Sequence, residues 1–464
     1  MSSTGSSQQV CSGFLRSLNR REALRIGGLT GLGISLPELL KQRSAVASQA
    51  SLGKVKQIIM LYLHGGPPQQ EMFDPKPNGP SVVRGEFGAI STSVPGVQFG
   101  ELFPQTAKLA HQLAVVRSMS HDNPNHVQAC LPANTGHVHP KAFRSKGDFP
   151  PSDTDFPPFG AVLDHVRPAV GNLPTWVRVG PLMSRSNGTT IHGQTPGFLG
   201  EKHSSFAVDQ KLLPADVEVQ AIKPNPELTS LRLQSRRSLL KQFDESREIL
   251  DQSATAKNVD TFYQKAFGLL SSEETRKAFL LRDEKPTTRE RYGKSEFGQR
   301  CLLARRLAEA GVPMTTVSYC HKPSRSWDTH SRHFTRMKDS LAPTFDTALS
   351  ALIEDLRERS MLDETLVFVN AEFGRTPTIN KNSGRDHWPW AYSLALAGAG
   401  VSAGAVHGAS DESAAYVTQS PHDPRDMAAT IYQLLGVPHD TILHDKANRP
   451  HHLIIGKPID PVIV

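Results

Sequence analysis

One stretch of the chain, 57–63, is apolar without interruption after its first residue and leads directly into His-Gly-Gly-Pro at 64–67. A short apolar run of this kind is typical of a strand that is buried on both faces of a parallel sheet. Further strand patterns lie at 113–117, 175–179, 314–319, 365–369 and 392–397, and helical patterns lie at 104–114, 159–166, 301–310, 426–435 and from Pro343 to Leu356. This alternation predicts an α/β fold, a three-layer sandwich with a mainly parallel central sheet and helices on both faces.

Three short segments bring carboxylate, imidazole and guanidinium groups together, each beside an expected strand end. They are Ser-Trp-Asp-Thr-His at 326–330, Ala-Glu-Phe-Gly-Arg at 371–375 and Gly-Arg-Asp-His-Trp at 384–388. Ligands of such sheets bind beyond the carboxyl ends of the strands. Carboxylates with imidazoles suit a divalent metal, and arginines suit an oxyanion such as phosphate or sulfate. These segments therefore predict a hydrolase-type pocket without naming its substrate.

The first 47 residues are typical of an export signal. Arg20 and Arg21 precede an uncharged, glycine-rich apolar stretch, and Ala-Val-Ala at 45–47 offers a cleavage site. This pattern resembles a twin-arginine signal, so we expect the export machinery as a partner and a mature chain of 48–464 in the periplasm or outside the cell. The alternative is an attached basic amphipathic helix, because the stretch falls short of the about 20 apolar residues that span a bilayer. No transmembrane segment is expected in the mature chain.

Charge and cysteine content narrow the classes of partner and site. The formal net charge is +7, yet no basic block with interleaved aromatic residues stands out, so nucleic acid is not an expected partner. Four cysteines are present, one of them, Cys11, in the predicted signal, and the remaining three can form one disulfide at most. No Cys-x-x-Cys occurs, which makes a thiolate zinc site unfavourable.

A rival motif, Gly-Val-Ser-Ala-Gly at 400–404, matches the nucleophile elbow of serine hydrolases. That elbow requires a helix beginning at the serine, and the residues after Ser402 lack helical periodicity. We therefore interpret it as a loop.

Several stretches together resemble the domain-of-unknown-function family 1501, whose members are similar to the alkaline phosphatase and sulfatase superfamily. They follow one another along nearly the whole mature chain: 65–67, 73–77, 84–87, 117–118, 327–330, 372–377 and 384–389, after the paired arginines. The resemblance implies an alkaline phosphatase-like domain over 48–464. A helix-rich polar stretch predicts a cap or insertion at about 210–295.

The superfamily resemblance implies one or two divalent cations, zinc, calcium or manganese, held by Asp and His at strand ends. Carried over by position, the candidate metal ligands are His64, Asp328, His330, Glu372, Asp386 and His387. Two positions depart from the superfamily pattern, because His64 stands where Asp is usual and Phe373 where His is usual.

The nucleophile is assigned in the same way, whereas the proton carrier and the anion contacts are assigned from the types of residue present. The stretch 123–126 resembles one that follows the nucleophile in the phosphodiesterase branch, which leaves Asp122 or Ser118 as the candidate, at a helix start. Metal-activated water would need neither. His126 is a candidate for ligation or proton transfer, and Arg375 and Arg385 would compensate charge on the ester oxygens.

Each candidate also has a structural reading. Asp328 could stabilise an Asx turn, Asp386 with His387 could pin a loop, and Glu372 with Arg375 could form a structural ion pair. The functional prediction is an exported metal-dependent hydrolase of phosphate or sulfate esters, acting on a small anionic ester or on a sulfated or phosphorylated glycan. The alternative is a degenerate member that binds an anionic glycan or a partner protein.

Overall fold

The computed structural model describes residues 55–140, 146–214, 273–319 and 326–464. The predicted signal, 1–47, lies outside these residues, as does most of the predicted cap at about 210–295, so both stay predictions. Among the described residues, none of the helices combines the length and apolar character needed to cross a membrane.

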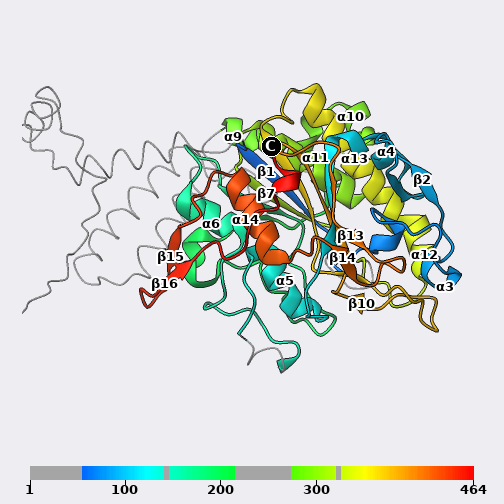
Figure 1. Cartoon of the computed structure of the whole chain (residues 1–464). Helices are drawn as coiled ribbons and strands as arrows, with labels where there is room; N and C mark the ends of the chain where they lie inside the picture. Colours follow the sequence, from blue (N-terminus) through cyan, green and yellow to red (C-terminus); the bar gives the residue numbers. More distant parts are fainter. Residues whose placement is uncertain (1–54, 141–145, 215–272, 320–325) are drawn as a thin grey trace, which may run out of the picture. The chain divides into compact units, whose positions relative to one another are not determined.

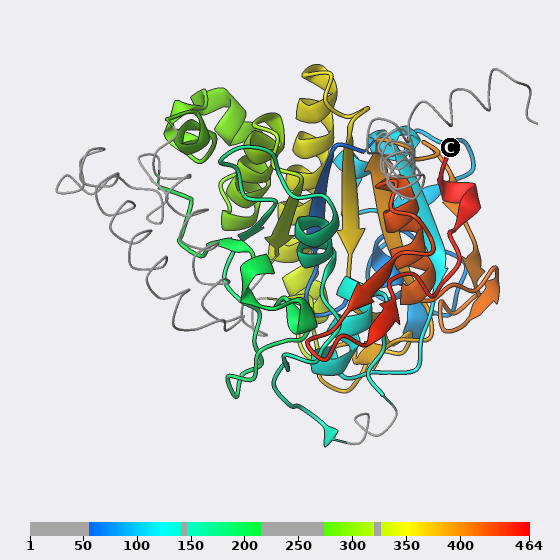
Figure 2. The same cartoon turned by 90° about the vertical axis from the view of Figure 1, so that its left-hand side faces the viewer.

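An eight-stranded sheet forms the centre of the fold (Figures 1 and 2). Its strands are β1 (Gln57–Tyr62), β4 (Leu113–Met119), β5 (Trp176–Val179), β6 (Phe206–Val208), β7 (Met314–Ser318), β8 (Thr365–Asn370), β11 (Tyr392–Gly398) and β12 (Val406–His407). Their order is β12-β4-β11-β8-β1-β7-β5-β6. Strand β11 is antiparallel to both of its neighbours, and the other pairings are parallel.

Helices cover both faces of this sheet. The described helices of eight or more residues are α5 (His126–Thr135), α6 (Phe159–Val166), α11 (Glu296–Glu309), α13 (Ala342–Glu358) and α14 (Pro424–Leu434), and a shorter helix is α4 (Pro104–Lys108). Helix α11 packs on β1, β5 and β7 and against α13, which also contacts α4, whereas α6 packs on β5 and β7 and α5 contacts α14. Figure 1 shows α11 and α13 on one side of the sheet and α6, α5 and α14 on the other. The predicted three-layer α/β fold with a mainly parallel sheet is therefore confirmed.

Shorter elements occupy the connections. The strands among them are β2 (Ala89–Ser91), β3 (Gln98–Gly100), β9 (Gly374–Arg375), β10 (His387–Trp388), β13 (Ala409–Ser410), β14 (Val417–Gln419), β15 (Ile442–His444) and β16 (Pro450–His452). The short helices are η1 (Gln69–Glu71), α3 (Ser81–Arg84), η2 (Ala110–Gln112), η4 (Gly197–Leu199), η5 (Glu201–His203), α9 (Glu273–Ala278), η7 (Leu281–Asp283), α10 (Pro286–Arg291), α12 (His333–Arg336), η9 (Met337–Leu341) and η10 (Asp460–Val462).

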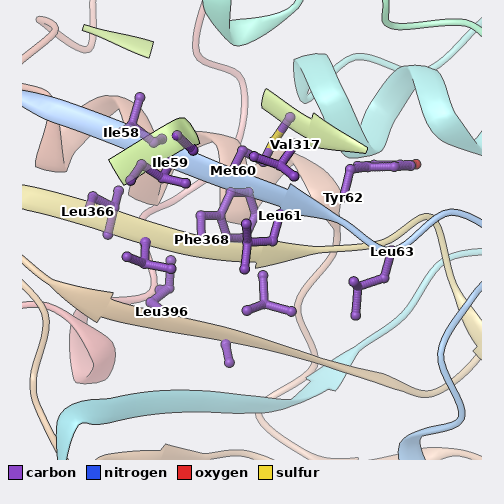
Figure 3. Close-up of a cluster of buried hydrophobic side chains, with 14 of the residues drawn as sticks. Ile58, Ile59, Met60, Leu61, Tyr62, Leu63, Val317, Leu366, Phe368 and Leu396 are labelled. Atoms are coloured by element: carbon purple, nitrogen blue, oxygen red, sulfur yellow. The ribbon is translucent and has the colours of Figure 1, made fainter. Parts of the chain in front are cut away.

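The core explains why these sequences form these elements. Strand β1 lies between β7 and β8, and its apolar side chains Ile58 to Tyr62 are buried among those of the neighbouring strands (Figure 3). In α13 the apolar residues that recur at helical spacing are all buried, and Pro343 occupies the first turn, where its missing N–H leaves no gap in the hydrogen bonding. Burial on both faces is what an unbroken apolar strand indicates.

Several boundaries differ from the sequence-based expectation, among them the start of α11, which was expected at 301 and lies at Glu296. The helix expected over 104–114 ends at Lys108, and a short 3-10 turn follows before β4 begins at Leu113. Pairing of β4 with β11 and β12 overrides the helical pattern there. The helix expected from 426 begins at Pro424, because the side chain of Asp423 caps its first turn.

The strand directions place the site. Because β11 is antiparallel to both β4 and β8, these two strands point the same way as β1 and β7. The segments that follow β1, β4, β7 and β8 therefore leave the same edge of the sheet. Each of the histidine-, carboxylate- and arginine-bearing segments begins there.

Candidate metal centre

Three segments supply one cluster of four side chains at this edge. His126 is the first residue of α5, where the side chain of Asn125 caps the helix by accepting from the Gln128 N–H at 3.1 Å. Asp328 and His330 come from the loop after β7. His387 lies in β10, which pairs with β9 directly after β8. Residues far apart in the sequence thus reach one point.

The four side chains converge through their ligand atoms. Asp328 Oδ1 lies 2.9 Å from His330 Nε2 and 3.2 Å from both His126 Nε2 and His387 Nε2. The Nε2 atoms of His330 and His387 are 2.9 Å apart. We call these four residues the metal-centre cluster.

The Nδ1 atom of each of the three imidazoles has a hydrogen-bond partner outside the cluster. Nδ1 of His126 lies 2.6 Å from a carboxylate oxygen of Glu372, and Nδ1 of His330 lies 2.6 Å from one of Asp386. Nδ1 of His387 lies 2.6 Å from the Pro124 carbonyl oxygen. These oxygens accept, so each Nδ1 carries the proton in the neutral ring and each Nε2 presents a lone pair. Three lone pairs and one carboxylate oxygen then face one another, an arrangement that a cation at their centre would stabilise.

Electrostatics keep Asp328 and His387 in their ligating forms, whereas they shift His330 toward its protonated form. Burial alone would raise the pKa of Asp328, but Arg375 and the three imidazoles outweigh it and hold that pKa far below its usual range. Burial lowers the pKa of His387 to about 4, which keeps its ring neutral near pH 7. His330, whose side chain is 45% exposed, has its pKa raised by its hydrogen bond to Asp328.

The guanidinium groups of Arg375 and Arg385 donate hydrogen bonds to other groups of the chain. The Arg375 guanidinium donates to Asp328 Oδ1 at 2.7 Å and to backbone carbonyls of Gly65, Gly66 and Arg385. Arg385 is fully buried and donates to Glu71 and to three backbone carbonyls, so each of its nitrogens already has an acceptor. The expected contact of both arginines with the ester oxygens therefore stays a prediction. Arg375 positions Asp328, and Arg385 holds Glu71.

Two predicted ligands, His64 and Glu372, lie next to the cluster but outside it. Glu372 Oε1 accepts from the Gly65 N–H at 2.7 Å and lies 3.3 Å from His64 Nδ1. Burial would raise the pKa of Glu372, but His64 and His126 hold it well below its usual range. His64, Glu372 and Cys130 form a second buried group with ligand atoms within 4.8 Å of one another. Glu372 joins the two groups, because it also orients His126.

Asp386 contacts the cluster from its rim. Its Oδ1 lies 2.6 Å from His330 Nδ1 and accepts from the Asn380 side-chain amide at 3.1 Å. The contact with Nδ1 fixes the orientation of the His330 ring. Sequence reasoning missed Asn380 and the Pro124 carbonyl. The spacing of residues in a polar loop does not show which amide or carbonyl group will form a hydrogen bond within the site. Pro124 did lie inside the 123–126 stretch that the sequence analysis singled out.

Neither candidate nucleophile stands in the cluster. Ser118 lies inside strand β4, fully buried, and a Cβ built on Gly408 would come within 2.0 Å of its hydroxyl oxygen. Asp122 lines a neighbouring pocket of about 570 Å³ with His121, Trp390, Tyr416, His422 and Arg425 among others. The residue at the helix start beside the cluster is His126 itself. A side-chain nucleophile at a helix start therefore stays a prediction.

Comparison with protein families gives one match, to the family described as "Protein of unknown function (DUF1501)", over residues 55–463. The chain belongs to this family. The sequence resemblance is thereby confirmed over nearly the whole predicted mature chain. Among curated proteins, none matches.

Solved structures with a similar fold include a sulfatase from Pseudoalteromonas, 14% identical, with a TM-score of 0.37 over 86% of this chain and 70% of that one. A protein of the alkaline phosphatase superfamily from Vibrio parahaemolyticus is 13% identical, with a TM-score of 0.39 over 89% and 71%. A lipoteichoic acid synthase from Listeria monocytogenes is 11% identical, with a TM-score of 0.37 over 89% and 78%. At these identities the likeness concerns the fold alone.

Proposed function

We propose that this family member is a metal-dependent hydrolase of phosphate or sulfate esters that works outside the cytoplasm. One observation supports it above the others. Three imidazole Nε2 atoms and the Asp328 carboxylate face a common point, and each imidazole is locked in the ligating tautomer by an acceptor behind it. The ester class rests on the sequence resemblance to the phosphatase and sulfatase superfamily.

The donor set fits a divalent transition metal. His126, Asp328 and His387 offer three ligand atoms within 4.8 Å of one another, the number that catalytic zinc sites use. Zinc or manganese suits this set better than calcium, which takes six to eight oxygen ligands. A bound ion would polarise the ester oxygen and lower the pKa of a water molecule, so that no side-chain nucleophile is needed.

The chain's own residues would orient the reactants. Arg375 holds Asp328, Glu372 holds His126, and the Pro124 carbonyl holds His387, so that the site is arranged before substrate arrives. His330 is the most exposed of the three histidines and can act either as a further ligand or as the group that passes a proton to the leaving oxygen. The adjoining pocket would take the organic part of the ester.

The test is a panel of nitrophenyl phosphate monoesters, phosphate diesters and sulfate esters, assayed with added zinc and manganese. We expect hydrolysis of at least one class. The Asp328→Asn/His387→Asn variant should lose both bound metal and turnover, because two of the three ligands are weakened or removed. The matched control is His452→Asn, at an exposed histidine. Equal rates in the variant and the wild type would contradict the proposal.

A binding protein without catalysis is the second candidate. It is favoured by the commitment of Arg375 and Arg385 to internal partners and by the position of Ser118 outside the cluster. Stoichiometric metal with no hydrolysis of any ester, together with saturable binding of a sulfated or phosphorylated glycan, would decide for it.

A further inference from the structure

A third group of metal-ligand side chains lies apart from both the metal-centre cluster and the group formed by His64, Cys130 and Glu372. His139 follows α5, Asp155 precedes α6, and His192 lies in the loop between β5 and η4. Their ligand atoms are all within 4.8 Å of one another. His192 is fully buried and His139 is 8% exposed. We call these three residues the loop cluster.

The hydrogen bonds of His192 define its protonation. Its Nε2 lies 3.0 Å from the Phe149 carbonyl oxygen, which can only accept, so Nε2 carries the proton of the neutral ring. Its Nδ1 then points a lone pair at a carboxylate oxygen of Asp155, only 2.6 Å away. Two acceptors cannot face each other at this distance unless a cation, either a proton or a metal ion, lies between or beside them.

His139 favours the metal ion over the proton. Its ring lies against that of His192 with centroids 4.5 Å apart, so a protonated His192 would carry its charge beside a second buried imidazole. A metal ion would use both rings as ligands, whereas a proton would use one.

The surroundings have the features that support metal ligands. A backbone carbonyl orients His192, and the Ser152 N–H donates to the same Asp155 oxygen at 3.2 Å. The Phe149 ring packs against both imidazoles, with centroids 5.2 Å from His139 and 4.8 Å from His192. The metal-centre cluster shows the same pattern at His387, which is held by a carbonyl on one side and faces a carboxylate on the other.

We propose that the loop cluster binds a divalent transition-metal ion, of the zinc class, that is distinct from the ion of the metal centre. Two imidazoles and one carboxylate suit zinc, cobalt or nickel rather than magnesium or calcium. The ion joins three separate loops, and His139 also lines the pocket of about 570 Å³. It therefore fixes one wall of that pocket.

The experiment counts metal ions per full-length chain after loading with zinc and removal of excess. Four proteins are compared: the wild type, Asp328→Asn/His387→Asn, His139→Gln, and the combination of all three substitutions. The first two variants should each hold one equivalent fewer than the wild type, and the combination should lose both. His452→Gln is the control for loss of a surface histidine.

A second measurement guards against misfolding. Zinc should raise the melting temperature of Asp328→Asn/His387→Asn, and this increase should disappear when His139→Gln is added, while far-ultraviolet circular dichroism stays that of a folded chain. Asp155→Asn provides an independent variant of the same cluster. An unchanged metal count in both His139→Gln and Asp155→Asn would overturn the proposal. Because activity is not measured, the result is independent of the proposed ester hydrolysis.

Discussion

At the scale of single residues, the account depends on which nitrogen of each histidine is free. The Nδ1 atom of each ring contacts one acceptor, which is Glu372 for His126, Asp386 for His330 and the Pro124 carbonyl oxygen for His387. The Nε2 atom of each ring is therefore directed at Asp328. The sequence placed His330 and His387 near each other by their position after strand ends. It could not give the tautomers, because these depend on contacts between residues that lie 56 to 263 positions apart in the sequence.

Asp386→Asn tests the orienting role. The amide weakens the hold on His330 without removing a ligand, so we expect metal affinity or turnover to fall about 10- to 100-fold, the range for such supporting residues. Isothermal titration with zinc and the rate of ester hydrolysis measure this. A fall as complete as that of Asp328→Asn would show that Asp386 itself binds the ion.

His330→Gln separates the two roles of His330. As a proton carrier, its loss should leave the metal count unchanged, lower the rate, and affect an ester with a good leaving group less than one with a poor leaving group. As a ligand, its loss should lower the metal count. Metal analysis of the same preparation used for kinetics distinguishes these results, and unchanged metal with unchanged rates on both esters would remove His330 from the site.

At the scale of elements, sharp turns after the strands bring the ligands close. Gly65 has φ +108°, and a Cβ there would lie 2.3 Å from the Asp328 backbone nitrogen. The unbroken strand at 57–63 and the glycines after it were visible in the sequence. The antiparallel direction of β11 was not, because side-chain periodicity does not encode strand direction.

Gly65→Ala should therefore displace Asp328 and lower metal occupancy. Gly188→Ala is the matched control, because Gly188 also has positive φ, +86°, but a Cβ there meets nothing within 4 Å. Both variants carry about 1–2 kcal/mol of backbone strain, and only the first adds a clash. Chemical unfolding and metal analysis compare them. Equal losses of stability and equal metal counts would show that the close approach at Gly65 is unimportant.

At the scale of the whole molecule, buried neutral histidines make stability depend on pH. His137 is buried, stacks on Phe156 at 3.4 Å and bonds the Leu453 carbonyl oxygen at 2.9 Å. Burial lowers the pKa of His137 from its ordinary 6.5 to about 4. The unfolded chain then binds a proton at a pH where the folded chain does not, so this residue's contribution is present above pH 6.5 and is lost as the pH falls toward 4.

His137→Gln tests this dependence. The wild type should lose up to about 3 kcal/mol of unfolding free energy through His137 between pH 6.5 and 4, at about 1.4 kcal/mol for each unit of pKa. The variant should show a flatter slope over that range, whereas His452→Gln, at an exposed position, should keep the wild-type slope. Denaturant unfolding at several pH values measures it, and parallel curves for His137→Gln and the wild type would refute the assignment.

The proposed export likewise concerns the whole chain, and it rests on the sequence of residues 1–47, outside the described structure. Twin-arginine transport depends on the arginine pair, so Arg20→Lys/Arg21→Lys should leave the full chain in the cytoplasm. Cell fractionation with both forms expressed side by side checks this, and equal amounts of the two forms in the periplasm or medium would contradict the prediction.

The fold class and most of the cluster were predictable, since apolar runs define the strands and the polar residues after them share one edge. The sequence left ligation and proton transfer both open for His126. Ser118 and Asp122 were placed by analogy with the superfamily, and Arg385 by its residue type. In the structure Ser118 is buried in the sheet, and the Glu71 carboxylate, 314 residues away, accepts from Arg385. Contacts between residues so distant in the sequence form only on folding, and no local sequence pattern predicts them.

The most direct test of the metal centre is anomalous X-ray diffraction from crystals of protein purified without chelator, recorded on both sides of the absorption edge of the metal found by elemental analysis. The account predicts an anomalous peak within bonding distance of Asp328 Oδ1 and of the Nε2 atoms of His126 and His387. Ordered side chains at that position with no peak, in crystals of a chain loaded with zinc and manganese, would contradict it.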